Sequence, residues 1–79
     1  MIKPAQIRAA RSLLSWSQQE LADRAVLSLT AINRLELGQV DTRISTLEAV
    51  EDAFQKAGIE FINERDGSFG VKLRAVKTA

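Results

Sequence analysis

The most constraining feature of the sequence is a pair of helix-start signals that lie close together. Ser17-Gln18-Gln19-Glu20 matches a capping box, in which the serine hydroxyl and the glutamate carboxylate each bind a free backbone N–H at a helix start. Ser28 is a second N-cap residue a short distance along the chain. The spacing leaves room for a helix of about eight residues followed by a tight turn, and it excludes a long helix here.

Three further helices are predicted around this segment. Pro4 suits a first helical position and opens a helix that runs to about Leu14. The helix after Ser28 ends at Gly38, where a left-handed cap is favourable. Ser45-Thr46-Leu47-Glu48 is a second capping box and predicts a fourth helix, which ends near residue 58.

Beyond Gly58 the apolar period changes from near 3.6 to 2, which predicts strands. Residues 59–63 and 69–76 alternate in polarity, and Asp66-Gly67 between them is a turn signal. Glu60 is expected to face Lys72 or Arg74 across this hairpin. The sequence therefore predicts one mainly α domain, with four helices in residues 1–58 and a C-terminal β-hairpin in residues 59–76.

The composition excludes several classes of function. The 79 residues include no cysteine, histidine or tyrosine, so disulfides, thiolate metal sites and most nucleophile–base pairs are excluded. No apolar run approaches the ~18 residues of a membrane span, and the N-terminus lacks a signal-peptide core. We expect a cytoplasmic protein with no membrane segment, no metal, no cofactor and no enzymatic activity.

Charge is distributed unevenly along the chain. Residues 1–45 carry six basic against four acidic residues, residues 46–64 carry one against five, and residues 65–79 carry four against one. A nucleic-acid contact is therefore expected on the N-terminal half, with the acidic fourth helix turned away.

The two short helices after Ser17 and Ser28, joined by a turn, describe a helix-turn-helix. The segments 17–22, 31–38 and 45–47 resemble the XRE-type (phage repressor/Cro-like) DNA-binding family, and the resemblance covers roughly residues 5–58. It implies a lambda-repressor-like helical fold, a third helix that lies in the major groove of double-stranded DNA, and a dimer. It also implies that Arg11 and Glu36 form a structural ion pair between the first and third helices.

The resemblance further implies DNA contacts by Gln18, at the start of the second helix, and by the third helix. The implied positions of the third helix are Ser28, Leu29, Thr30, Asn33 and Arg34. A helical wheel agrees, because Ile32 and Leu35 point one way while most of these residues point the other. Asparagine pairs with adenine, arginine with guanine, and apolar groups contact the thymine methyl. We therefore expect base contacts from Leu29, Thr30, Asn33 and Arg34, although Arg34 also suits a backbone phosphate.

Phosphate contacts are expected at helix N-termini, where free N–H groups and the helix dipole favour anions. Ser17, Gln18 and Ser28 lie at such positions. Arg43, before the fourth helix, suits either a phosphate contact or a solvated charge.

The sequence departs from the family pattern in the turn and at two leucines. Val26 stands where the family usually has glycine, and a β-branched residue with positive φ is strained. Leu29 and Leu37 occupy positions that are commonly polar, so they suit either thymine methyls or a protein partner.

Other motifs favour structural interpretations. Glu48, Glu51 and Asp52 are more typical of a solvated helix face than of a cation site. Trp16 suits the core better than a stacking platform. The GxxG at residues 67–70 lies in a hairpin turn, unlike the GxxG of RNA-binding KH domains.

A two-stranded hairpin leaves unpaired edges, and pairing with a second copy across a two-fold axis would satisfy them. The expected dimerisation residues are the apolar positions Ile59, Phe61, Phe69, Val71 and Leu73. The favoured function is a dimeric, sequence-specific transcriptional regulator that binds a palindromic operator with half-sites ~34 Å apart. The alternatives are an antitoxin that binds a toxin and represses its own operon, and a protein-binding adaptor that does not bind DNA.

Overall fold

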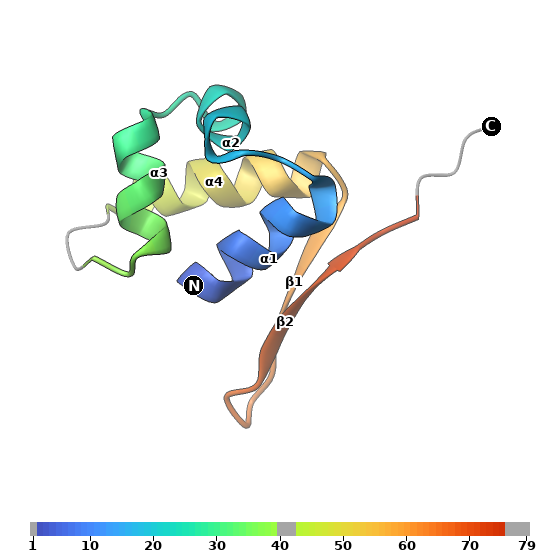
Figure 1. The fold of residues 1–79 in the computed structure, drawn as a ribbon. Coiled ribbons are helices and arrows are strands. Elements are labelled where there is room, and N and C mark those ends of the chain that lie inside the picture. The colour runs from blue at the N-terminus through green and yellow to red at the C-terminus, as the bar shows by residue number, and fades with distance from the viewer. Residues whose placement is uncertain (1, 40–42, 76–79) are drawn as a thin grey trace.

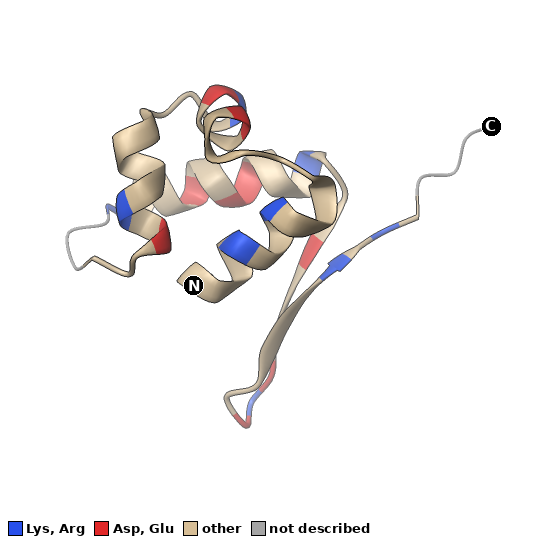
Figure 2. Ribbon diagram, in the orientation of Figure 1, with Lys and Arg blue, Asp and Glu red and all other residues tan. Residues whose placement is uncertain are grey.

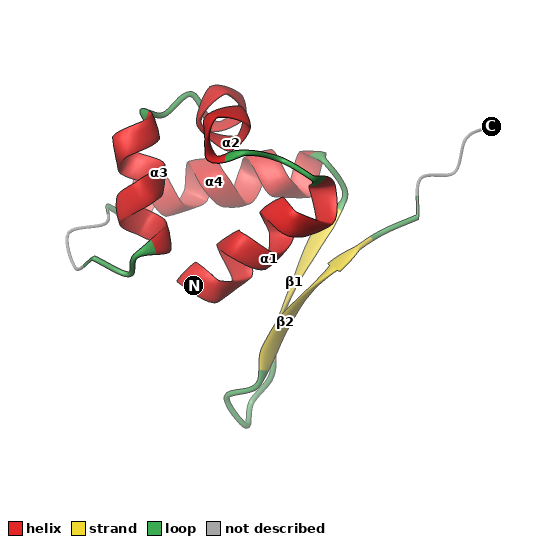
Figure 3. Ribbon diagram, in the orientation of Figure 1, coloured by secondary structure: helices red, strands yellow, loops and turns green. Residues whose placement is uncertain are grey.

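The computed structural model of the chain describes residues 2–39 and 43–75. Four helices are followed by a two-stranded antiparallel sheet, which extends away from the helical body (Figures 1 and 3). The elements are α1 (Pro4–Leu14), α2 (Gln18–Ala25), α3 (Leu29–Glu36), α4 (Ile44–Lys56), β1 (Ile59–Asn63) and β2 (Phe69–Leu73). The predicted mainly α fold with a C-terminal hairpin is confirmed. Val76, the last residue of the predicted hairpin segment, lies outside the described residues.

Serine caps begin the two central helices, as predicted. The Ser17 hydroxyl accepts the Glu20 N–H at 3.1 Å, and the Ser28 hydroxyl accepts the Ala31 N–H at 3.1 Å. The Glu20 carboxylate does not complete the predicted capping box, because it pairs with Arg24 one turn along α2. One half of the box therefore caps the helix, and the other half stabilises its exposed face.

The predicted start of the fourth helix is wrong by two residues, because the expected N-cap was Ser45. Arg43 is the N-cap of α4, and its carbonyl oxygen accepts the N–H groups of Thr46 and Leu47 at 3.0 and 3.2 Å. Its side chain makes no capping hydrogen bond. Ser45 consequently lies inside the first turn and does not cap the helix.

Aromatic side chains connect the helices to the hairpin. Phe54 of α4 is fully buried, and the Trp16 ring stacks on it with 5.5 Å between centroids. Phe61 of β1 meets Phe54 edge-on at 5.9 Å. The Arg24 guanidinium covers the Trp16 ring at 4.5 Å. Trp16 is thus partly buried and packs against the core.

The strands pair in a regular register. Glu60 lies opposite Lys72, so of the two predicted partners, Lys72 and Arg74, the structure shows the first. At the turn, the Asp66 carboxylate accepts hydrogen bonds from the hydroxyl and N–H of Ser68, at 2.6 and 2.9 Å. These two bonds lower the pKa of Asp66 below its usual value of 3.8.

A buried amide joins the hairpin to α1. The Gln6 Nε2 donates to the carbonyl oxygens of Ile62 and Gly70, at 3.1 and 3.0 Å, and so contacts both strands. Its Oε1 accepts the Lys3 N–H at 2.8 Å. The hairpin is therefore held on the helical core by polar as well as apolar contacts.

None of the helices in residues 2–39 and 43–75 is both long enough and apolar enough to cross a membrane.

Candidate nucleic-acid interface

Helix α3 presents one buried and one exposed face. Ile32 and Leu35 are buried against the core, whereas Thr30, Asn33 and Arg34 are exposed. Leu29 is also exposed, at the first position of the helix. An amide, a hydroxyl and a guanidinium are therefore available on one helix that lies at the outside of the molecule (Figure 1).

Helix α3 is anchored at its C-terminal end through Glu36. The Arg11 guanidinium binds the Glu36 carboxylate with two bonds of 2.7 and 2.8 Å, and Glu36 is itself buried. These hydrogen bonds, with the carboxylate charge, raise the pKa of Arg11. Arg11 also donates to the Trp16 carbonyl oxygen at 3.1 Å. The ion pair implied by the family resemblance is thus present, and it fixes α3 against α1.

Arg8 is a second anchor, which the sequence interpretation missed. Its guanidinium donates to the backbone carbonyl oxygen of Glu36, at the C-terminal end of α3. A cation is favourable there, because carbonyl groups at a helix end lack helical partners. The available signal was the three-residue spacing to Arg11, which places both arginines on one side of α1.

The residues expected at phosphates lie at helix starts, but their side chains have partners within the fold. The Gln18 Nε2 donates to the Glu36 carboxylate at 3.4 Å and retains its second N–H for another acceptor. The hydroxyls of Ser17 and Ser28 accept capping bonds and retain their O–H groups as donors.

The arginines of the N-terminal half divide into two groups. Arg8, Arg11 and Arg24 bind groups within the fold. Arg34 and Arg43 are exposed, and neither guanidinium has an ion-pair partner among the described residues. Arg34 lies in the last turn of α3 and Arg43 is the N-cap of α4, so they lie at the two ends of the intervening loop. Figure 2 shows acidic residues along α4.

The turn between α2 and α3 carries the strain that the sequence indicated. Val26 has φ 55° and ψ 49°, in the left-handed region, and its side chain is 88% exposed. Its N–H bonds to the Asp23 carbonyl oxygen, and the next N–H, of Leu27, bonds to the Ala22 carbonyl oxygen. These bonds close α2 and turn the chain toward α3.

Apolar side chains are also exposed on both sides of the loop that follows α3. Leu37, the C-cap of α3, is 65% exposed, and Ile44, the first residue of α4, is exposed to a similar degree. Ile44 carried no functional prediction from the sequence. This surface is available either to DNA or to a protein.

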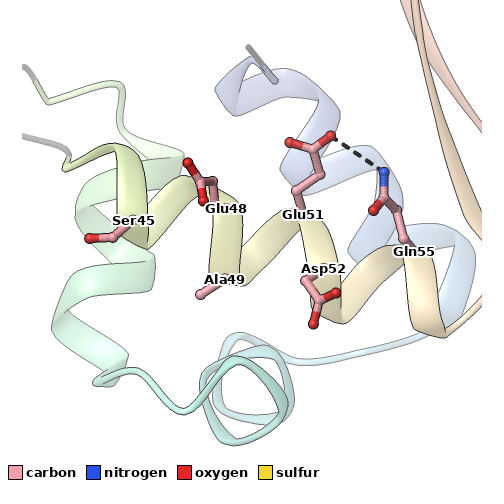
Figure 4. Close-up of a pocket in the computed structure, with 6 residues that line it drawn as sticks. All are labelled: Ser45, Glu48, Ala49, Glu51, Asp52 and Gln55. Carbon is pink, nitrogen blue, oxygen red and sulfur yellow. Dashed lines mark hydrogen bonds between the residues drawn. The ribbon is translucent and has the colours of Figure 1, made fainter.

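The acidic residues of α4 line a shallow concavity on its outer side (Figure 4). Asp52 pairs with Lys56 at 2.9 Å, and Glu51 accepts from Gln55 at 3.4 Å. Over the ranges 2–39 and 43–75, no group of three or more histidine, cysteine or acidic side chains is arranged to hold a metal ion. The geometry is that of a solvated helix face.

The five hairpin residues expected at a dimer interface differ in exposure. Ile59 is 1% exposed and belongs to the protomer core, so its side chain is not available to a second copy in this fold. Phe61 and Val71 pack against the core and are half-buried. Phe69 and Leu73 remain 44% and 38% exposed.

A family model described as helix-turn-helix matches residues 7–61, which is more than half of the chain. A search of curated proteins found no match.

Proposed function

Since the chain belongs to the XRE-type helix-turn-helix family, whose members carry a DNA-binding domain, we propose that it is a dimeric, sequence-specific transcriptional regulator that reads DNA with α3. The observation that carries this proposal is the exposed polar face of an α3 that is anchored at Glu36 by Arg8 and Arg11. A rigidly held helix presents its side chains to base edges in a constant geometry.

On this proposal Asn33 and Arg34 supply hydrogen bonds to base edges, and Leu29 and Thr30 supply apolar and hydroxyl contacts. The major groove accepts a helix, and an amide bonds adenine through two atoms. Arg34 also suits a contact with a backbone phosphate.

In this arrangement the phosphate backbone is bound by four side chains, those of Ser17, Gln18, Ser28 and Arg43. The three polar side chains lie at the N-termini of α2 and α3, where the helix dipoles add to their free donors. Arg43 adds a charge that has no partner among the described side chains.

The dimer forms through the hairpin and places two α3 helices on one face of the DNA. A two-fold axis requires a palindromic operator with half-sites about 34 Å apart. Because Gln6 bonds to both strands, the hairpin holds a constant position relative to the helices.

The test is fluorescence anisotropy with the DNA directly upstream of the gene and with a scrambled duplex, across a salt series. A specific regulator of its own promoter binds the upstream duplex at least ~10³-fold more tightly, and its affinity falls steeply with salt. If selection from a random duplex library also enriches no sequence, sequence-specific binding is refuted.

A second candidate function is that of an antitoxin, which represses its own operon and also binds a toxin. The exposure of Leu37 and Ile44 beside α3 favours it, because exposed apolar patches mark protein contacts. The test is purification of the tagged chain expressed with its neighbouring gene. Recovery of the neighbouring gene product in stoichiometric amount supports this candidate.

A further inference from the structure

The hydrogen-bond pattern of the hairpin determines which backbone groups remain free. The Arg74 N–H bonds to the Gly58 carbonyl oxygen at 2.9 Å, and the Glu64 N–H bonds to the Ser68 carbonyl oxygen at 2.8 Å. In antiparallel pairs, hydrogen-bonded and non-hydrogen-bonded residues alternate. The even-numbered residues therefore bond across the hairpin, and the odd-numbered residues 59, 61, 63, 69, 71 and 73 direct their N–H and C=O groups outward.

No third strand pairs with either edge within the described chain. The two edges nevertheless differ in what a partner strand would bury. On β1, Ile59 is already in the protomer core and Asn63 is polar. On β2, Phe69 and Leu73 expose apolar surface on either side of Val71. A partner strand on the β2 edge would therefore bury more exposed apolar surface than one on the β1 edge.

We propose that the β2 edge binds the β2 edge of a second copy of this chain, antiparallel, with the two-fold axis through Val71. This inference rests on the proposed dimer and specifies its edge and register. The three outward-facing residues of β2 are symmetric about Val71, so each N–H finds the partner's C=O. Phe69 then stands opposite the partner's Leu73, and Val71 stands opposite the partner's Val71.

The side chains on both faces of the resulting four-stranded sheet fit this register. On the face toward the helices, all three cross-strand pairs are apolar, and such pairs stabilise a sheet. On the outer face, Lys72 lies opposite the partner's Gly70, and a Cβ atom at Gly70 would have no neighbour within 4 Å. The lysine therefore has room, and Glu60 remains opposite it in the strand register within the protomer.

Cysteine substitution tests the register directly, because the natural chain has no cysteine. Opposed residues of an antiparallel hydrogen-bonded pair have Cα atoms about 5.5 Å apart, within the range of a disulfide. We expect Val71→Cys to form a covalent dimer on mild oxidation. Asn63→Cys, on the β1 edge, is the matched control and is expected to remain monomeric on a denaturing gel.

A proline variant provides an independent test that leaves the hairpin ladder intact. The Val71 N–H points outward, so Val71→Pro removes no hydrogen bond of the hairpin ladder, although it also replaces a half-buried side chain that packs against the core. We expect this variant to sediment as a monomer at a concentration where the natural chain and Asn63→Pro sediment as dimers. Circular dichroism checks that each variant is folded. If the Val71→Pro variant does not fold, the comparison of Val71→Cys with Asn63→Cys decides the question.

The outcomes separate this inference from the proposed function. A natural chain that sediments as a monomer at all concentrations overturns both the dimer and the β2 pairing. A dimer that cross-links through Asn63→Cys but not through Val71→Cys overturns the β2 pairing alone and leaves DNA binding by a dimer in place.

Discussion

Single residues hold α2 and α3 in place, and the residue in the turn between them adopts a strained conformation. Val26 adopts φ 55°, although a β-branched side chain disfavours that region. Its side chain is almost fully exposed, so it contributes little to the core. The strain is therefore not offset by burial of this residue.

Val26→Gly is expected to raise the free energy of unfolding by about 1 kcal/mol, because glycine enters the left-handed region without a Cβ clash. In a domain of this size the corresponding rise in Tm is about 4–8 °C. Calorimetry measures the change in Tm. Val26→Ala retains a Cβ and is the control, for which we expect a smaller gain. A glycine variant that melts below the natural chain would contradict this account of the turn.

Residues that act on their own neighbours in the chain, such as those at helix ends, could be identified from the sequence. Ser17, Ser28 and Gly38 mark helix ends: the two serines are N-caps, and Gly38 adopts a left-handed φ of 72° directly after Leu37, the C-cap of α3. Arg8 was not recognised, because its bond to the Glu36 carbonyl oxygen depends on how α1 packs against α3. No local pattern specifies that packing.

At the scale of elements, α1 and the hairpin form one unit through Gln6. Gln6 lies on the buried side of α1, beside Ile7, although its side chain is polar. A polar residue at an inward position signals a buried hydrogen bond. The sequence shows this position, but only the fold shows that both strands are its partners.

Gln6→Ala is expected to lower the free energy of unfolding by about 1–3 kcal/mol, because three buried hydrogen bonds are lost. Hydrogen exchange should accelerate most at the amides of β1 and β2. Gln19→Ala, which removes an exposed helix glutamine bonded only to Asp23, is the matched control and should change stability by less than about 0.5 kcal/mol. Equal effects of the two substitutions would refute this role of Gln6.

The hairpin turn is expected to depend on pH through Asp66. The hydrogen bonds from Ser68 depress the pKa of this carboxylate in the folded state. A depressed pKa means that the bonds stabilise the turn above the usual pKa of 3.8 and are lost as the pH falls through the lower, folded value. An NMR titration of the Ser68 amide should show an acid transition below pH 3.8, and Asp66→Asn should abolish it. A midpoint above that value would contradict the assignment.

Helix boundaries were predictable from the sequence where a side chain caps the helix, and they were not predictable where only main-chain bonds do so. The start of α4 was misplaced, since main-chain bonds to the Arg43 carbonyl oxygen form its first turn and Ser45 plays no part in the cap. Alternation identified both strands, but it did not distinguish apolar residues facing the protomer core from those left exposed. Ile59 and Phe69 belong to these two different groups.

On the scale of the whole molecule, Arg34 of α3 and Arg43 at the start of α4 are exposed cations without an ion-pair partner among the described residues, whereas α4 itself carries several acidic residues (Figure 2). The net charge of +1 does not indicate this uneven distribution. The helical wheel predicted which side of α3 is exposed, because amphipathic periodicity reflects burial. The operator sequence was not predictable, since base preference depends on how the helix enters the groove.

Arg43→Ala is expected to weaken binding about equally on specific and random DNA and to reduce the salt slope by about 1, as for the loss of one phosphate contact. Arg65→Ala, which removes an exposed arginine at the hairpin turn, is the matched control and should leave the slope unchanged. A loss confined to the specific duplex would show that Arg43 contacts a base.

The central claim is that α3 reads bases, and Asn33→Ala tests it most directly. Anisotropy measures the affinity of this variant and of the natural chain for the selected operator and for a random duplex. We expect a loss of about 1–3 kcal/mol on the operator, relaxed preference at one base position, and almost no change on random DNA. An equal loss on both duplexes would contradict the claim, because it would show that Asn33 contacts the backbone.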